Sequence, residues 1–129
     1  MRIIGLDHVQ LAMPVGAEDQ ARRFYVGLLG FREEAKPPAL AGRGGCWFSA
    51  NGVKLHLGVQ PDFVPARKAH PAFFVTDLSQ LVGVLERAGI DFEVDGSPNG
   101  IHRIHLHDPF GNRIEFIQDG QGFSQQVEA

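Results

Sequence analysis

One pattern runs twice along the 129-residue chain, and this repeat limits the folds that the chain can adopt. The first copy has His8 near its start and His56 near its end, and the second has His70 and Glu115 at the corresponding places. The two pairs are spaced 48 and 45 residues apart, and a glycine stands four positions before the second member of each. A repeat that sets His and His against His and Glu predicts one metal ion bound between two related halves.

The length fits one domain, with module one over about residues 3–59, a connector over 60–69, module two over about 70–118 and a polar tail over 119–129. A formal charge of −3 without a basic stripe argues against nucleic acid as a partner. Because Cys46 is the only cysteine, no intrachain disulfide can form, and a reducing compartment is expected. No segment resembles a signal peptide or a membrane span, so we expect a cytoplasmic protein with no membrane partner.

Hydrophobic periodicity gives both modules the order β-α-β-β-β. In module one, residues 3–13 alternate as a strand, and residues 18–29 have helical spacing up to Gly30. Three further strands are predicted over 31–35, 46–49 and 53–59, the last two joined by a hairpin at Asn51-Gly52. In module two, a strand over 70–76 precedes a helix from the N-cap Asp77 to Gly89, and strands follow over 90–94, 103–107 and 113–118. Two such modules side by side predict an α+β fold with a curved, mixed eight-stranded sheet and helices on its outer face.

Strand alternation predicts which side chains point into the open cup of this sheet. Ile114 and Phe116 fit the helix-covered face, which leaves Glu115 on the cup side, and the same reasoning applies to every strand. The side chains assigned to the cup are the four candidate ligands together with Gln10, Trp47, Lys54, Phe74, Arg103, His105 and His107. His102 is assigned to the other face, and the sequence gives His102, His105 and His107 no defined role.

The chemistry of the four candidate ligands favours a divalent metal. Neutral imidazole and carboxylate are common ligands of divalent first-row ions, and three histidines with one glutamate leave room for water or a chelating substrate. A lone strand histidine is more often a hydrogen-bonded or surface residue, so it is the repeat that raises the odds. A cysteine-rich structural zinc site is excluded by the single cysteine.

Three segments carry a resemblance to a known family: Leu6-Asp-His-Val, Arg22-Arg-Phe-Tyr with Leu29-Gly-Phe, and Asp108-Pro-Phe-Gly-Asn-Arg-Ile-Glu-Phe. Together they resemble the vicinal oxygen chelate (VOC) superfamily, which includes glyoxalase I, bleomycin-resistance proteins and extradiol dioxygenases. The resemblance implies a glyoxalase-like fold and metal ligands at His8, His56, His70 and Glu115. The members with three ligands match His8, His70 and Glu115, whereas His56 departs from the carboxylate of glyoxalase I and the glutamine of the epimerases.

The resemblance implies a metal-dependent lyase or isomerase that acts on a small substrate with vicinal oxygens, bound by zinc, nickel, manganese or iron. Glu115 or His56 would carry the proton if one of them dissociates from the metal, and otherwise a metal-bound hydroxide would act. Among the side chains assigned to the cup, those expected to bind substrate are Gln10, Trp47, Phe74, Arg103 and His105. A homodimer is expected. Two alternatives stay open: a metal-free drug- or metabolite-binding protein of the bleomycin-resistance type, which the aromatic Trp47 and Phe74 would suit, and an extradiol-type dioxygenase.

Overall fold

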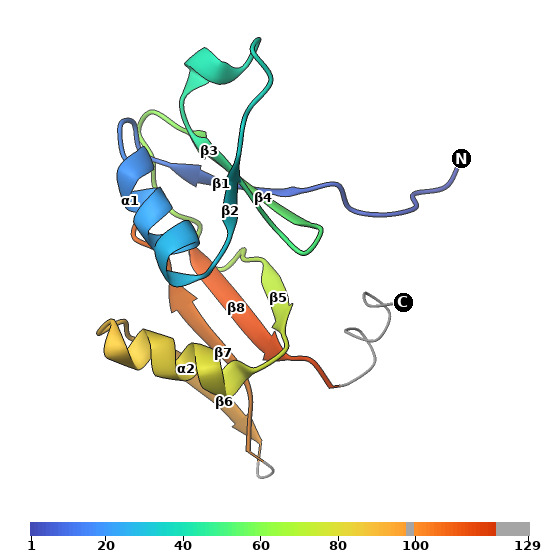
Figure 1. Ribbon diagram of the computed structural model, residues 1–129, viewed down its shortest axis with the longest axis vertical. Helices are drawn as coiled ribbons and strands as arrows, with labels where there is room; N and C mark the ends of the chain where they lie inside the picture. The colour runs from blue at the N-terminus through green and yellow to red at the C-terminus, as the bar shows by residue number, and fades with distance from the viewer. Residues whose placement is uncertain (98–99, 121–129) are drawn as a thin grey trace. The chain divides into compact units, whose positions relative to one another are not determined.

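The computed structural model describes residues 1–97 and 100–120, so most of the expected polar tail lies outside the described residues. The chain divides into two compact units, Met1–Pro65 and Ala66–Ala129. Each unit has one helix and a mixed sheet of four strands (Figure 1), which confirms the predicted α+β class with two βαβββ modules. Among the described residues, no helix has both the length and the apolar character needed to cross a membrane.

The first unit pairs its first strand with its last. Its elements are β1 (Val9–Met13), α1 (Glu18–Arg22), a π-helical continuation of α1 (Arg23–Leu28), β2 (Arg32–Glu34), a short 3₁₀ turn (Ala41–Arg43), β3 (Cys46–Ala50) and β4 (Val53–Val59). The sheet order is β1-β4-β3-β2, in which β1 runs parallel to β4 and the other neighbours are antiparallel. Residues far apart in the sequence therefore become neighbours along β1 and β4.

The predicted first strand over residues 3–13 was too long. Only Val9–Met13 forms β1, and the side chains of Ile3, Ile4 and Leu6 are exposed. The reason is the partner strand, because β4 starts at Val53 and the first paired residues are Val9 and Leu55. An alternating sequence becomes a strand only where a neighbouring strand supplies hydrogen bonds.

The core of the first unit lies between its helix and its sheet. The Tyr25 ring, from the π-helical segment, stacks on Phe48 of β3 with ring centroids 5.4 Å apart, and both side chains are buried. The predicted hairpin is confirmed, since Asn51 and Gly52 have φ of 50° and 82° between β3 and β4. Positive φ at both central residues is the signature of a type I′ turn. The helix therefore covers the face of the sheet that contains Phe48.

The second unit repeats this topology. Its elements are β5 (Ala72–Val75), α2 (Leu78–Arg87), β6 (Glu93–Ser97), β7 (Gly100–His107) and β8 (Arg113–Gln118), in the sheet order β5-β8-β7-β6. Strand β5 runs parallel to β8, as β1 does to β4. The strand predicted over residues 90–94 begins later, at Glu93, and continues to Ser97, which pairs with Gly100 at the start of β7. Helix α2 packs on β7 and β8 over Leu85, Ile104 and Ile114, which are fully buried.

Side-chain hydrogen bonds fix both ends of the segment that joins β5 to α2. The Asp77 carboxylate accepts from the Gln80 backbone N–H at 3.1 Å, which confirms Asp77 as the N-cap. Gln118 of β8 accepts from the Leu78 N–H at 2.8 Å and donates to the Thr76 carbonyl at 2.8 Å. The start of α2 is thereby attached to the end of β8, which holds the helix in register on the sheet.

We expect Asp77→Ala to lower the free energy of unfolding by about 0.5–2 kcal/mol, because the variant loses the carboxylate that caps α2. Chemical denaturation followed by circular dichroism measures this change. Ser79→Ala, at an exposed position in the same first turn, is the matched control and should change stability much less. Equal stability of Asp77→Ala and the wild-type protein would contradict the capping role.

Candidate functional site

Cross-strand pairing lines up one row of side chains across the sheet of the first unit. Gln10 on β1 pairs with His56 on β4, His56 pairs with Trp47 on β3, and Trp47 pairs with Glu34 on β2. Directly paired residues point to the same face of a sheet. Since Phe48 belongs to the helix-covered face, this row occupies the opposite, uncovered face, as the alternation predicted for Trp47.

The second unit carries a row in the same register. Ala72 on β5 pairs with Glu115 on β8, Glu115 pairs with His105 on β7, and His105 pairs with Glu93 on β6. Glu115 therefore occupies the position in its sheet that His56 occupies in the first. The sequence spacing indicated that His56 and Glu115 are equivalent, and the strand pairing of the two sheets agrees with this.

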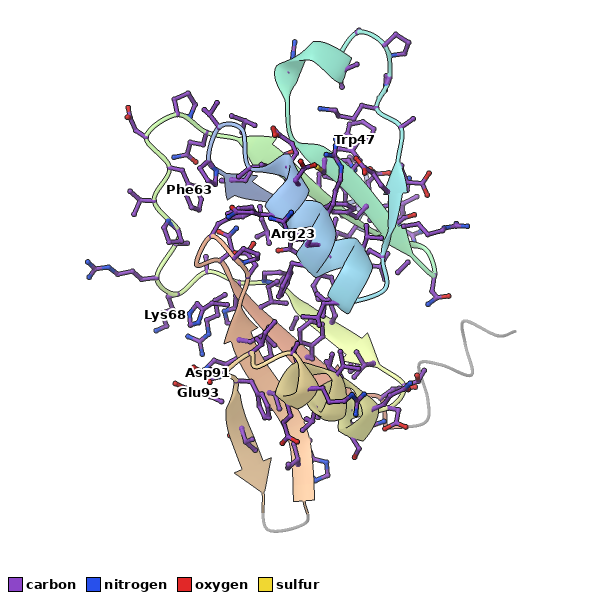
Figure 2. The ribbon with its side chains drawn as sticks, turned by 60° about the vertical axis from the view of Figure 1, so that its left-hand side comes forward. Arg23, Trp47, Phe63, Lys68, Asp91 and Glu93 are labelled. Atoms are coloured by element: carbon purple, nitrogen blue, oxygen red, sulfur yellow. The ribbon has the colours of Figure 1, made fainter. Side chains whose placement is uncertain are left out.

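A cavity of about 740 Å³ opens over the row of the first unit. Its aromatic and apolar wall includes Trp47 and Leu40, and its polar lining is made by Asp7, His8, Gln10, Glu34, Ser49, Lys54 and His56. Trp47, labelled in Figure 2, comes from β3. A volume of this size is within the range of small-molecule sites in proteins.

Three rings are stacked in this cavity. The His56 ring lies between Trp47, at a centroid distance of 4.1 Å and an interplanar angle of 4°, and His8, at 4.2 Å and 17°. His56 is buried, with 7% of its surface exposed. Burial lowers the pKa of His56 most, and the nearby charge of His8 lowers it further. His56 is therefore held as a neutral imidazole near neutral pH.

Asp7, the residue before His8, forms a hydrogen bond with one edge of the His8 ring. His8 Nδ1 lies 2.8 Å from Asp7 Oδ2, and Lys54 Nζ lies 3.7 Å from the other carboxylate oxygen. The hydrogen bond with His8 and then the charge of Lys54 lower the pKa of Asp7, so this carboxyl is ionised. Because a carboxylate can only accept, Nδ1 of His8 carries the proton, and in the neutral ring Nε2 keeps its lone pair.

His70 in the second unit shows the same arrangement. Its Nδ1 lies 2.7 Å from the Lys68 carbonyl oxygen, which can only accept a hydrogen bond. The neutral His70 ring therefore also keeps its lone pair on Nε2, and this atom lies 4.0 Å from Glu115 Oε1. Two ligands at about 2.1 Å each from one ion span up to about 4.2 Å. The pair of atoms is thus within the reach of a single divalent ion.

Charged neighbours surround Glu115 and His105 on the same sheet. Arg103 Nη1 lies 3.5 Å from Glu115 Oε2, the oxygen that does not face His70. His105 Nε2 lies 2.9 Å from Oε2 of Glu93, which is labelled in Figure 2 at the start of β6. The Arg103 guanidinium therefore lies beside the Glu115 side chain, and a carboxylate is a common ligand of divalent metal ions.

The structure brings the expected ligands together in two pairs, His8 with His56 in the first unit and His70 with Glu115 in the second. Within the residues that the structure describes, no three His, Cys, Asp or Glu side chains form a group suited to hold a metal ion. Of the expected substrate-binding residues, Gln10 and Trp47 line the cavity of the first unit. Arg103, His105 and Phe74 belong to the second unit, where Phe74 is 55% exposed.

Sequence reasoning missed four polar residues around these rows, namely Asp7, Glu34, Ser49 and Glu93. Ser49 Oγ donates to Glu34 Oε1 at 2.6 Å beside Trp47, and Asp7 and Glu93 hold His8 and His105. Ser49 could have been found by alternation, because it stands two residues after Trp47 on β3. Asp7 lies before the start of β1, and the positions of Glu34 and Glu93 depend on how β2 and β6 pair with their neighbours. The sequence defines neither the strand end nor this pairing.

Gly58 on β4 makes room for the side chain of Gln10. A Cβ atom placed on Gly58 would lie 2.5 Å from Gln10 Nε2 and 3.1 Å from its Cδ, and the three atoms nearest to that Cβ all belong to Gln10. Glycine inside a strand often marks such a close approach. The Gln10 amide therefore lies across β4 at Gly58.

Comparison with known proteins identifies the family of the chain. The model of the Glyoxalase/Bleomycin resistance protein/Dioxygenase superfamily matches residues 5–116, and the chain belongs to this superfamily. A solved protein of Bacillus anthracis assigned to the glyoxalase family is 45% identical, with a TM-score of 0.85 over 92% of this chain and 98% of that one. No protein with a curated description matches the sequence.

Two more distant solved structures share the fold. The antibiotic-binding protein TnmS3 of Streptomyces sp. CB03234 is 22% identical, with a TM-score of 0.67 over 92% of this chain and 99% of that one. The fosfomycin resistance protein FosX of Listeria monocytogenes is 14% identical, with a TM-score of 0.71 over 94% and 95%. At these identities the likeness establishes the fold alone.

The lowered pKa of His56 predicts a pH dependence of stability. The His56 imidazole takes up a proton with a pKa of about 6.5 in the unfolded chain and with a lower pKa in the folded protein. Its contribution to the free energy of unfolding is therefore complete above about pH 6.5. Its contribution decreases as the pH falls below about 6.5 towards the lower pKa of the folded protein. Between about pH 7.5 and pH 5.5, the metal-free wild-type protein should therefore lose more unfolding free energy than His56→Phe. Denaturation at both pH values, followed by Trp47 fluorescence, measures this, and the same loss in both proteins would contradict it.

Proposed function

We propose that the chain is a metal-dependent enzyme of this superfamily, acting on a small substrate that chelates a divalent ion through neighbouring oxygens. The observation that carries the proposal is the matching state of His8 and His70. In both, Nδ1 is tied to an oxygen that can only accept, and Nε2 is left with its lone pair. An imidazole held in this way by a carboxylate or carbonyl is the usual form of a metal-ligating histidine.

The proposed ligands are Nε2 of His8, Nε2 of His70 and Oε1 of Glu115, contributed within one chain or by the two chains of a dimer. His56, the expected fourth ligand, is stacked between Trp47 and His8. Two imidazoles and one carboxylate suit zinc, nickel, manganese or iron, and leave positions for two substrate oxygens. When bound, a divalent ion supplies a Lewis acid that stabilises negative charge on a substrate oxygen.

The chain's own residues supply the remaining functions. Glu115 has Oε1 towards His70 and Oε2 towards Arg103. It would carry a proton on Oε1 only when that oxygen is not bound to a metal, while Oε2 stays beside the arginine. His56 is neutral, the form that accepts a proton, and is the second proposed proton carrier. Gln10 and Trp47 orient the substrate in the first unit, and Arg103 and His105, with Phe74, do so in the second. This set fits lyase or isomerase chemistry, in which a proton moves at a carbon next to an oxygen.

One observation favours a second candidate, a metal-free binding protein. The cavity of about 740 Å³ lies within the first unit alone, and its stacked rings offer an aromatic surface to a drug or metabolite. TnmS3, which shares the fold, is an antibiotic-binding protein. An extradiol-type dioxygenase would use the same His8, His70 and Glu115 with iron, because two histidines and one carboxylate are the ligands of ferrous oxygenases.

We expect near-stoichiometric divalent metal in the untagged wild-type protein and none in the double variant His8→Ala/Glu115→Ala, because two of three ligands are removed. Elemental mass spectrometry after reconstitution measures the metal. The matched control is His102→Ala/Glu86→Ala, which removes an exposed histidine and an exposed glutamate outside the proposed site and should keep the metal. Iron as the bound metal would favour the dioxygenase, and zinc or nickel the isomerase.

No metal in the reconstituted wild-type protein would overturn the enzyme proposal in favour of the binding protein. Metal that remains in His8→Ala/Glu115→Ala would show that the ligands are wrongly assigned. Loss of metal from the control variant as well would indicate general instability, which circular dichroism of each variant detects.

We propose a homodimer, supported by apolar side chains that the chain leaves exposed. Ile3, Ile4 and Leu6 are 90%, 92% and 81% exposed in front of β1, which is an edge strand. Contiguous exposed apolar residues beside an open edge are typical of association surfaces. Light scattering at micromolar concentration should give the mass of two chains, and Ile4→Asp/Leu6→Asp should lower it towards one. A wild-type monomer would contradict this proposal.

A further inference from the structure

We propose that His56 is a positioning residue, which acts by stacking and holds the His8 ring in the orientation that binds metal. His56 would then not be a fourth ligand alongside His8. This inference rests on the proposed metal site and concerns the part of it that lies in the first unit. It is carried by the three stacked rings of Trp47, His56 and His8.

The stack prevents His8 and His56 from binding one ion together. A metal lies in the plane of the imidazole that binds it, at about 2.0–2.1 Å from the nitrogen. The rings of His8 and His56 are only 17° from parallel, with centroids 4.2 Å apart, so their planes run past each other. No point at bonding distance from a nitrogen of one ring also lies in the plane of the other. Joint ligation would require His56 or His8 to leave the stack.

His56 is held more firmly than His8, which makes it suited to a supporting role. It lies inside β4, is paired with Gln10 on one side and Trp47 on the other, and is 7% exposed. The Trp47 ring covers one of its faces almost in parallel, at 4°. His56 therefore presents its other face as a fixed surface.

His8 needs such a surface because it lies just before β1 and lacks a strand's support. Its side chain is 39% exposed, and Asp7 holds only the edge of the ring, through Nδ1. A single hydrogen bond leaves the ring free to rotate about that contact, and a stacked neighbour removes this freedom. Asp7 and His56 together define both the position of Nδ1 and the plane of the ring, and so the direction of the Nε2 lone pair.

The test compares a substitution that keeps stacking with two that do not. His56→Phe retains an aromatic ring between Trp47 and His8 but offers no ligand nitrogen, whereas His56→Leu is apolar and of similar bulk without a ring, and His56→Ala removes both. Zinc affinity is measured by competition with a chelating dye. We expect His56→Phe to bind zinc within about threefold of the wild-type affinity, because a stacked ring remains. His56→Leu and His56→Ala should bind about 10- to 100-fold more weakly, the range for residues that orient a metal ligand.

A second readout needs no metal. Ring-current shifts of the His8 ring protons, measured by nuclear magnetic resonance on the metal-free protein, should be retained in His56→Phe and lost in His56→Leu. His56→Leu also serves if His56→Ala fails to fold. Circular dichroism establishes that each compared variant is folded.

The outcomes separate this inference from the proposed function. If His56→Phe loses zinc as severely as His56→Ala while the wild type binds it, His56 is a ligand and the positioning role is overturned. If His56→Leu binds as well as the wild type, stacking has no effect on the site and the inference also fails. If the wild-type protein binds no zinc, manganese, nickel or iron, the metal proposal itself fails. The His8 ring-current shifts then still decide whether His56 fixes the ring.

Discussion

Parallel pairing of the first strand with the last strand is the constraint on which the rest of each unit depends. In the first unit it places β1 beside β4, and in the second it places β5 beside β8. Parallel neighbours cannot be joined by a tight turn, so the connection must be long, and in each unit a helix and two further strands occupy it. The same pairing brings together side chains 48 and 45 residues apart, which is how His8 meets His56 and His70 meets Glu115.

The repeat gives the two units the same framework but different electrostatics. His56 and Glu115 occupy equivalent positions in their sheets, yet the first is a buried imidazole between rings, with a lowered pKa, and the second is an acidic side chain beside Arg103. A stack of aromatic rings stabilises a neutral group, whereas an arginine stabilises an anion. The two units thus share one framework, and different side chains in equivalent rows give the first a stacked imidazole and the second a carboxylate beside an arginine.

Local rules predicted most of the fold and the sheet face on which Gln10, Trp47 and His56 lie. The Asn51-Gly52 turn and the Asp77 cap are decided by a few neighbouring residues, and both are present as predicted. Alternation likewise assigned Trp47 and Phe48 to opposite faces of the sheet. The length of β1 could not be predicted, because it depends on where its partner begins. The stacking of His56 depends on side-chain rotamers, and the contact from Asp7 to His8 depends on the path of the chain before β1 begins. Neither leaves a periodic pattern in the sequence.

The missing side chain of Gly58 has a consequence for how this chain can vary. Because the Gln10 side chain occupies the space that a Cβ at position 58 would enter, the two positions are sterically coupled across β1 and β4. A larger residue at 58 is compatible with the present backbone only if residue 10 becomes shorter or turns away. Homologues should therefore change these two positions together. The pair offers a place where two compensating substitutions would reshape the cavity wall without disturbing the core on the other face of the sheet.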